Sequence, residues 1–298
     1  MRLKILVLGA NGQLGQQCRA TYRNHDWDFI FSSKNDLDIT SLTELRKIFF
    51  KEKPDYVLNF AAYTDVNLAE REMESAFLIN QYGPKNVAKA CSDIDATLIH
   101  ISTDYVFDGK NINSYTETDK VNPINIYGQS KLLGENEIKK YSNKYIILRT
   151  SWIFGLFKKN FFLTIFNLSK TKEIIEIVAD QKGIPTASTS IIGACFNIIE
   201  YLERVESNPW GIYHFSNQGP TNWFEFGSEI ILRLYYAGLI DRQPEIIPKE
   251  SSKLDFSPKR PLNSVLNTSK FQKEFNLKIF DWRELLDDLI QELLTRAK

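Results

Sequence analysis

The spacing of apolar and polar positions predicts strands that alternate with helices along the first half of the chain. Short apolar runs predict strands at 5–8, 28–31, 54–60, 96–102 and 145–149. Apolar residues at helical spacing predict helices at 13–22, 41–51, 73–80, 83–91 and 127–141. Thr40 or Ser41 is suited to cap the second helix. Strands that alternate with helices and lack polar interruptions are typical of an α/β fold with a doubly wound parallel sheet.

The alternation weakens after about residue 151. Strands are still expected at 173–178 and 212–215, with a helix at 190–202 between them. From Gly219 onward the chain has more Pro and Trp and less regular spacing. We therefore expect a smaller, discontinuous α/β region that covers the carboxyl ends of the strands.

Composition narrows the class of protein. The 298 residues are 43% hydrophobic, and 37 basic residues balance 37 acidic ones, so no overall charge favours nucleic acid or an anionic membrane as a partner. Three Cys without paired spacing predict buried thiols in a reducing compartment. No apolar stretch approaches the ~20 residues that a membrane span requires. These features predict a cytoplasmic protein.

A glycine-rich turn follows the first predicted strand. Gly9, Gly12 and Gly15 stand between that strand and the first predicted helix. Glycine allows a tight turn and a close approach of phosphate to the backbone, and helix N–H groups then face the anion. Three glycines alone would also suit an ordinary turn. Their place between strand and helix favours a dinucleotide site in a Rossmann-type fold.

The residues after the second predicted strand bear on the choice of cofactor. An acid there binds the ribose 2′-hydroxyl of NADH, whereas basic or hydroxyl groups accept the 2′-phosphate of NADPH. Here Ser33 and Lys34 come first, and Asp36 is the first acid. This order favours NADPH and leaves NADH open as an accepted cofactor. The alternative is a solvated turn with no role.

Tyr127 and Lys131 lie one helical turn apart on the helix after the fourth strand, which ends near Thr103. An ordinary Tyr pKa near ~10 is too high for proton exchange at neutral pH, and a neighbouring ammonium lowers it. We expect Tyr127 to donate a proton to a carbonyl oxygen, Lys131 to stabilise the phenolate and bind the cofactor ribose, and Thr103 to bind the same oxygen. Otherwise Tyr127 is a half-buried aromatic and Lys131 a surface charge.

The remaining titratable residues show no second site. His25, His100 and His214 lack the spacing of metal ligands or of a catalytic triad, and no metal site is expected. His100 lies within an apolar strand and is expected to be a hydrogen-bonded core residue. Glu135 and Glu137 are expected to be solvated.

Seven segments in order resemble the dTDP-4-dehydrorhamnose reductases, a family of extended short-chain dehydrogenases/reductases, along nearly the whole chain. The segments are 9–15, 59–66, 102–109, 127–131, 149–155, 180–186 and 260–264. The resemblance implies reduction by NAD(P)H of the 4-keto group of dTDP-6-deoxy-L-lyxo-4-hexulose to dTDP-L-rhamnose. It also implies a dinucleotide-binding domain of residues 1–156 plus about 188–215, and a substrate-binding domain of about 157–187 plus 216–298.

The resemblance also assigns roles to residues. It makes Thr103, Tyr127 and Lys131 the catalytic set. The implied cofactor-binding residues are Gly9, Asn11, Gly12, Gln13, Leu14, Ser33, Asp38, Ile39, Ala61, Ala62, Tyr63, Tyr127 and Lys131. The implied substrate-binding residues are Asp104, Val106, Trp152, Asn160, Gln181 and Arg260. Trp152 could instead be a core aromatic, and Arg260 could instead be a surface residue in a Pro-containing loop.

The chain departs from the family pattern at Phe60, at Asn67 and Leu68, and just after the glycine turn. Some members form a dimer through magnesium held by Glu residues, but Gln16 and Gln17 stand in that place here. We therefore expect a monomer or homodimer without a magnesium bridge.

Two other functions remain open. A sister nucleotide-sugar 4-ketoreductase would keep the fold and the Tyr/Lys chemistry and act on another deoxysugar. A non-catalytic NADP-binding regulatory subunit, of the type that serves methionine adenosyltransferase, would bind cofactor and a partner protein without turnover.

Overall fold

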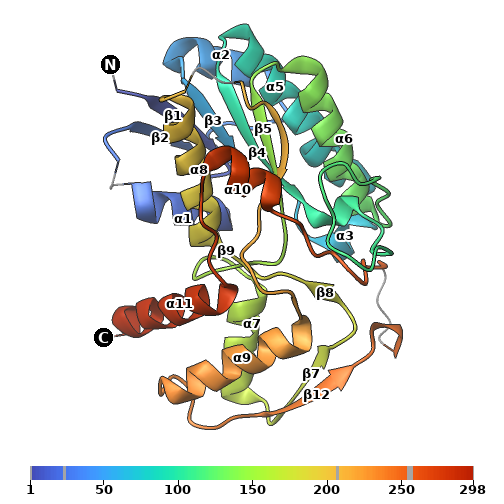
Figure 1. Cartoon of the computed structure of the whole chain (residues 1–298). Helices are drawn as coiled ribbons and strands as arrows, with labels where there is room; N and C mark the ends of the chain where they lie inside the picture. The colour runs from blue at the N-terminus through green and yellow to red at the C-terminus, as the bar shows by residue number, and fades with distance from the viewer. Residues whose placement is uncertain (1, 23–24, 206–207, 254–257, 298) are drawn as a thin grey trace.

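A parallel sheet of six strands forms the centre of the upper part of the molecule in the computed structural model, which describes residues 2–22, 25–205, 208–253 and 258–297 (Figure 1). The strand order is β10-β5-β4-β3-β1-β2. The strands are β1 (Lys4–Leu8), β2 (Asp28–Ser32), β3 (Tyr56–Asn59), β4 (Thr97–Thr103), β5 (Tyr145–Thr150) and β10 (Gly211–His214). All neighbouring pairs are parallel. The predicted strands are confirmed, with ends that differ by a few residues.

Helices cover both faces of this sheet (Figure 1). One face carries α1 (Gln13–Thr21), α8 (Ser188–Leu202) and α10 (Ser269–Phe275). The other carries α2 (Leu42–Glu52), α5 (Gly83–Asp93) and α6 (Ile126–Tyr141). Ser41 caps α2, as its position predicts.

Successive residues of one strand belong to two different cores. Ile5 and Val7 of β1 pack in the core under α1 and α8, whereas Leu6 and Leu8 pack in the core under α2 and α5. Strand side chains alternate between faces, so a strand covered on both sides is apolar throughout. The doubly wound arrangement is therefore confirmed. All three Cys are free and buried within these cores.

A second, smaller body of structure lies below the carboxyl ends of the strands (Figure 1). Its helices are α7 (Phe161–Thr171), α9 (Trp223–Tyr236) and α11 (Trp282–Ala297). Its main strands, β7 (Ile174–Val178) and β12 (Glu245–Lys249), pair in parallel. Two short pairs join β6 (Ile153–Phe154) to β9 (Thr186–Ala187) and β8 (Lys182–Gly183) to β11 (Thr221–Asn222). The sequence predicted one strand of this body, β7, but not α7, α9, α11 or β12. The strand expected at 212–215 and the helix expected at 190–202 are β10 and α8 of the upper sheet.

Several short elements follow β3, β4 and β12 along the chain. They are α3 (Val66–Ala69), α4 (Met73–Phe77), the π-helical turn η2 (Leu78–Tyr82) and the 3₁₀ turns η3 (Asp104–Val106) and η4 (Ser251–Lys253). Within the parts of the chain described here, no helix is both long and apolar enough to cross a membrane.

The core of the lower body centres on Trp282, the first residue of α11. Trp282 has no exposed surface, packs edge-on against Phe226 of α9, and donates its Nε1–H to the Gly219 carbonyl at 2.8 Å. The Trp282 side chain is fully buried and its N–H is hydrogen-bonded. Its removal therefore leaves a cavity and leaves the Gly219 carbonyl without this partner.

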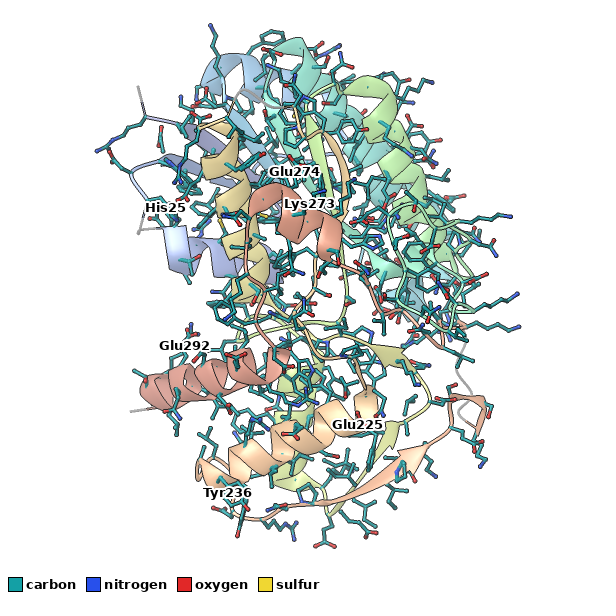
Figure 2. All side chains as sticks on the ribbon, viewed as in Figure 1. His25, Glu225, Tyr236, Lys273, Glu274 and Glu292 are labelled. Carbon is teal, nitrogen blue, oxygen red and sulfur yellow. The ribbon has the colours of Figure 1, made fainter. Side chains whose placement is uncertain are left out.

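We expect Trp282→Ala to lower the free energy of unfolding by about 3–5 kcal/mol. The matched control is Tyr236→Ala, because Tyr236 is 78% exposed at the outer end of α9 (Figure 2) and its loss should cost about 0.5 kcal/mol or less. Urea unfolding of both variants measures the difference. Equal losses would show that the lower core does not depend on Trp282.

Candidate active site

The glycine turn lies directly against the end of β3. Gly9 has a φ of +78°, and a Cβ on it would lie 2.6 Å from the Ala61 nitrogen. A Cβ on Gly15 would lie 2.5 Å from the Ala10 Cα. Only glycine allows these approaches. Gly12 begins α1 without a side-chain cap, so the first N–H groups of the helix remain free to bind an anion.

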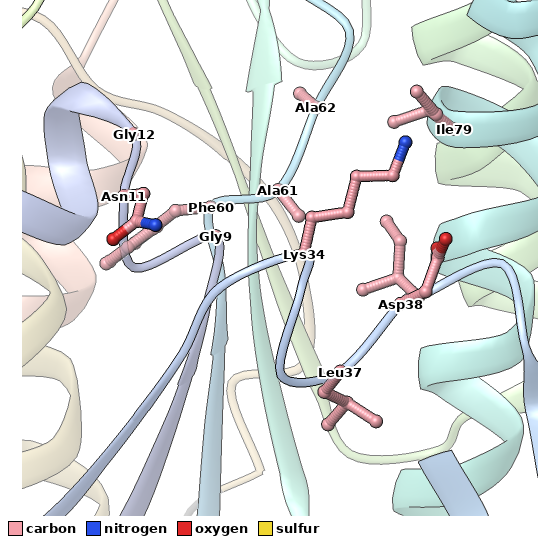
Figure 3. A pocket seen from close by; sticks show the side chains of 11 residues that line it. Gly9, Asn11, Gly12, Lys34, Leu37, Asp38, Phe60, Ala61, Ala62 and Ile79 are labelled. Atoms are coloured by element: carbon pink, nitrogen blue, oxygen red, sulfur yellow. The ribbon is translucent and has the colours of Figure 1, made fainter. Parts of the chain in front are cut away.

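A cavity of about 210 Å³ opens beside this turn (Figure 3). It is lined by Gly9, Asn11, Gly12, Lys34, Leu37, Asp38, Ile39, Phe60, Ala61, Ala62 and Ile79. The apolar lining suits an adenine, and the uncapped helix end suits a pyrophosphate. A dinucleotide therefore fits the residues present.

The structure brings most of the implied cofactor residues together here. Gly9, Asn11, Gly12, Asp38, Ile39, Ala61 and Ala62 line the cavity. Leu14 is instead buried in the sheet core, and Tyr63 binds Asn80 and Glu72. The side-chain nitrogen Nε2 of Gln13 is buried and, among the described residues, has no hydrogen-bond partner, which leaves it available to a ligand.

Ser33 and Lys34 differ in what they can offer a 2′-phosphate. The Ser33 hydroxyl donates to Asp36 Oδ2 at 2.6 Å, and its main-chain N–H donates to the same oxygen at 2.9 Å. Lys34 is exposed, and its side chain points towards Ile79 in the view of the cavity (Figure 3). The implied cofactor set did not include Lys34, although its position just after β2 is the place where a basic residue indicates binding of a 2′-phosphate.

The three expected catalytic residues meet at the carboxyl end of β4. Thr103 is the last residue of β4, and its hydroxyl group lies close enough to the Tyr127 phenol of α6 to lower that phenol's pKa. Lys131 lies one turn further along α6, only 2% exposed, and donates from Nζ to the Ile101 carbonyl at 2.6 Å. The fold thus places a phenol, a hydroxyl and an amine on adjacent elements.

Burial shifts the two titrating groups in opposite directions. It raises the pKa of Tyr127 to about 12, although Thr103 opposes the rise, so the phenol keeps its proton at neutral pH. Burial lowers the pKa of Lys131 to about 8, and the nearby Glu135 carboxylate opposes that change. Lys131 is therefore mainly charged at neutral pH but close to losing its proton.

The expectation that Glu135 is solvated is wrong. Glu135 has no exposed surface and accepts two hydrogen bonds from the Arg149 guanidinium of β5, at 2.9 and 2.7 Å. Ser102 donates to the same carboxylate at 2.6 Å. Glu135 lies one turn beyond Lys131 on the helix face that packs on the sheet, and that face is buried even where it is charged. Glu137 is half-buried and lies 3.9 Å from Lys85.

Asp104 adjoins the catalytic group with one free oxygen. It is 3% exposed, and its Oδ1 accepts from Thr103 at 3.1 Å, while Oδ2 has no partner among the described residues. Burial raises the pKa of Asp104 to about 7, although the nearby Ser264 and Thr103 hydroxyls oppose the rise. Its neighbour Val106 is fully buried against Phe107 and contributes to packing.

Trp152 has an unusual backbone for a bulky residue. Its φ is +46°, in the left-handed region, and its ring stacks on Trp223 with centroids 3.7 Å apart. A Cβ on Gly183 would lie 2.4 Å from the Trp152 ring. The stack and the glycine hold an otherwise unfavourable conformation, and such strain is common at functional sites.

A larger cavity, of about 660 Å³, holds two of the implied substrate residues. Gln181 and Arg260 line it together with Lys110, Lys259 and Ser251. Arg260 also donates to Asn67 Oδ1 at 3.2 Å. Asn160 lies apart from this cavity and caps α7, because its Oδ1 accepts from the Leu163 N–H and its Nδ2 donates to the Gly155 carbonyl. The described residues contain no group of three His, Cys, Asp or Glu placed to hold a metal ion.

Comparison with known proteins confirms the resemblance seen in the sequence. Residues 3–295 match the RmlD substrate binding domain family. The chain belongs to this family. The chain is 35% identical to a dTDP-4-dehydrorhamnose reductase of Aggregatibacter actinomycetemcomitans, over 96% of this chain and 98% of that protein. It is 34% identical to the Escherichia coli K12 protein of the same name, over 98% and 99%.

Solved structures of RmlD-type reductases have the same fold. The dTDP-4-dehydrorhamnose reductase of Bacillus anthracis in complex with NADP is 34% identical, with a TM-score of 0.91 over 98% of this chain and 100% of that one. A UDP-glucose 4-epimerase of Thermus thermophilus, 16% identical with a TM-score of 0.76, shares the fold alone.

The raised pKa of Asp104 predicts a pH dependence of stability. The folded state binds a proton on Asp104 up to about pH 7, whereas the ordinary pKa is 3.8. The folded chain therefore holds more protons than the unfolded chain within this window, so this contribution to stability falls as pH rises through it. Asp104→Asn should remove a loss on the order of 4 kcal/mol.

Urea unfolding across this pH range measures the effect as the difference between Asp104→Asn and the wild type. The difference is needed because burial lowers the pKa of His214 to about 3, which acts in the opposite direction. A difference that stays constant with pH would place the Asp104 carboxylate in the ionised form throughout.

The position of Lys34 predicts a selective effect on cofactor binding. Lys34→Ala should raise the Kd for NADPH about tenfold (~1.4 kcal/mol) and leave the Kd for NADH nearly unchanged, because only NADPH carries the 2′-phosphate. Lys51→Ala, an exposed lysine on α2, is the control. Fluorescence titration measures the Kd of each variant for both cofactors. If Lys34→Ala weakened the binding of NADPH and NADH equally, the Lys34 ammonium would not contact the 2′-phosphate.

Proposed function

We propose that this chain uses NADPH to reduce the 4-keto group of dTDP-6-deoxy-L-lyxo-4-hexulose to dTDP-L-rhamnose, with NADH as a weaker alternative. The observation that carries the proposal is the meeting of Thr103, Tyr127 and Lys131 at the end of β4, beside a dinucleotide cavity, in a chain of the RmlD family. When bound, the cofactor supplies the hydride that reduces the carbonyl carbon.

The chain's own residues supply the proton and its control. The Tyr127 phenol is protonated at neutral pH and donates its proton to the carbonyl oxygen. The Thr103 hydroxyl binds the same oxygen and orients it. The Lys131 ammonium stabilises the phenolate that remains, since an adjacent positive charge favours the anion. The phenolate then regains a proton from solvent.

Substrate binding is assigned to the larger cavity and to Asp104 and Trp152, which lie outside its lining. Arg260 suits a diphosphate because its planar guanidinium can donate two parallel hydrogen bonds, and Gln181 lines the same cavity. Asp104 offers its free Oδ2 to a sugar hydroxyl, and Trp152 offers its ring face. Val106 and Asn160, whose side chains serve packing and capping, would act through the backbone they hold.

The proposal also covers the oligomeric state, the cellular location and the division of the chain into two binding regions. We propose a cytoplasmic monomer or homodimer without a magnesium bridge, because Gln17 faces inward and accepts from Ser188 at 3.1 Å and neutral amides bind divalent cations poorly. Residues 1–156 and about 188–215 would bind the dinucleotide, and about 157–187 and 216–298 the sugar nucleotide, with α10 packed back on the sheet.

Loss of NADPH absorbance with the enzymatically generated keto-sugar tests the function. Tyr127→Phe should lower kcat about 10²–10⁴-fold, because it removes the proton donor, and leave the Kd for NADPH nearly unchanged. Tyr141→Phe, a phenol near the other end of α6, is the matched control and should retain activity.

Each other outcome has a defined meaning. Full turnover by Tyr127→Phe would remove Tyr127 from the role of proton donor. Turnover only with a different nucleotide keto-sugar would indicate a sister 4-ketoreductase. NADPH binding without turnover of any such sugar would indicate a non-catalytic NADP-binding subunit.

A further inference from the structure

His100 contacts the catalytic amine, although the proposed reaction assigns it no step. It lies in the middle of β4 with no exposed surface, and its Nε2 is 3.2 Å from Lys131 Nζ. Its other ring nitrogen, Nδ1, is 3.1 Å from the side-chain nitrogen of Asn59 on β3. The imidazole therefore joins a neighbouring strand to the amine that stabilises the Tyr127 phenolate.

The partners of Asn59 determine which nitrogen of His100 carries the hydrogen. The Asn59 carbonyl oxygen accepts the Ala61 N–H at 3.2 Å, so the amide NH₂ faces His100. A neutral imidazole has one N–H and one lone pair. Because Nδ1 faces a donor it must accept, and the single N–H is on Nε2. That N–H points at Lys131.

A donor aimed at Lys131 distinguishes its two protonation states. An ammonium has no lone pair for the Nε2–H, whereas a neutral amine has one. The tautomer of His100 therefore favours the neutral amine, and burial of Lys131 acts in the same direction, whereas burial of His100 keeps the imidazole itself neutral. Glu135 on the same helix favours the ammonium, and Arg149 of β5 partly neutralises Glu135. Tyr127 lies one turn before Lys131 on α6, and the titratable Asp104 and Tyr105 lie near the Tyr127 phenol.

We propose that His100 is a positioning residue for Lys131, and that Asn59 fixes its tautomer so that the Nε2–H faces the amine and makes its charged form less favourable. The proposal rests on the proposed function of Lys131. Ala61 lines the cofactor cavity and donates its N–H to Asn59. Asn59 contacts His100, and His100 contacts Lys131. These contacts link the cofactor cavity to the catalytic amine through the sheet.

Two substitutions at Asn59 test the tautomer without touching the catalytic residues. In Asn59→Leu the donor that faces Nδ1 is lost, so the hydrogen can move to Nδ1 and Nε2 can accept from the ammonium. In Asn59→Asp a carboxylate accepts from Nδ1–H, with the same result. Both should move the alkaline loss of kcat to higher pH, by about one unit, because Lys131 then stays charged longer.

The comparison of the two variants separates the imidazole from simple charge. A shift in Asn59→Asp alone would reflect the added negative charge and would overturn the proposal, as would no shift in either. Thr97→Val, at the other end of β4, controls for disturbance of the strand and should leave the profile in place.

Nitrogen NMR of the wild-type imidazoles gives a direct second measurement that needs no Asn59 variant to fold. The chain has three His, and the His100 signals are those lost in His100→Gln. A hydrogen on Nε2 is expected, and a hydrogen on Nδ1 would overturn the proposal. This result does not depend on turnover, whereas failure of the wild type to reduce any keto-sugar nucleotide would overturn the proposed function alone.

Discussion

The buried pair of Glu135 and Arg149 is the interaction on which the site depends. A carboxylate without exposure is costly unless it is paired and fully hydrogen-bonded. Here two bonds from the Arg149 guanidinium and one from Ser102 satisfy it. These bonds fix the position of α6 relative to Ser102 of β4 and Arg149 of β5. Because Tyr127 and Lys131 occupy the preceding turns of α6, the pair also determines where the reactive groups lie.

The same arrangement explains how a charged amine persists inside the sheet layer. Lys131 has an accepting carbonyl from Ile101 and a nearby carboxylate, but it also meets an imidazole and very little water. Burial favours the neutral amine, whereas the Glu135 carboxylate favours the ammonium. Together they bring the pKa of Lys131 to about 8, which suits the role that we propose for it, the stabilisation of a phenolate formed and lost in each turnover.

Much of the sheet could be predicted from sequence, because strands covered on both faces are apolar throughout and the glycine turn follows the first of them. The lower body was harder to predict. α9 carries Phe226, Ile230 and Leu234 at helical spacing, but nearby Trp and Pro residues suggested irregular structure. The sequence also could not show that Glu135 is buried, since a charge on an α-helix normally faces solvent and its partner Arg149 lies on a separate strand.

The chain passes several times between the core under α1 and α8, here called the sheet core, and the core of the lower body. Residues 154–187 pack in the lower core, 191–199 in the sheet core, 226–240 in the lower core, 271–279 in the sheet core, and 282–290 in the lower core again. The lower core is therefore built from three separate stretches of sequence. Recombination between related genes at a single crossover would give a mismatched lower core, so new substrate preferences in this architecture are more readily acquired through point substitutions than through exchange of a segment.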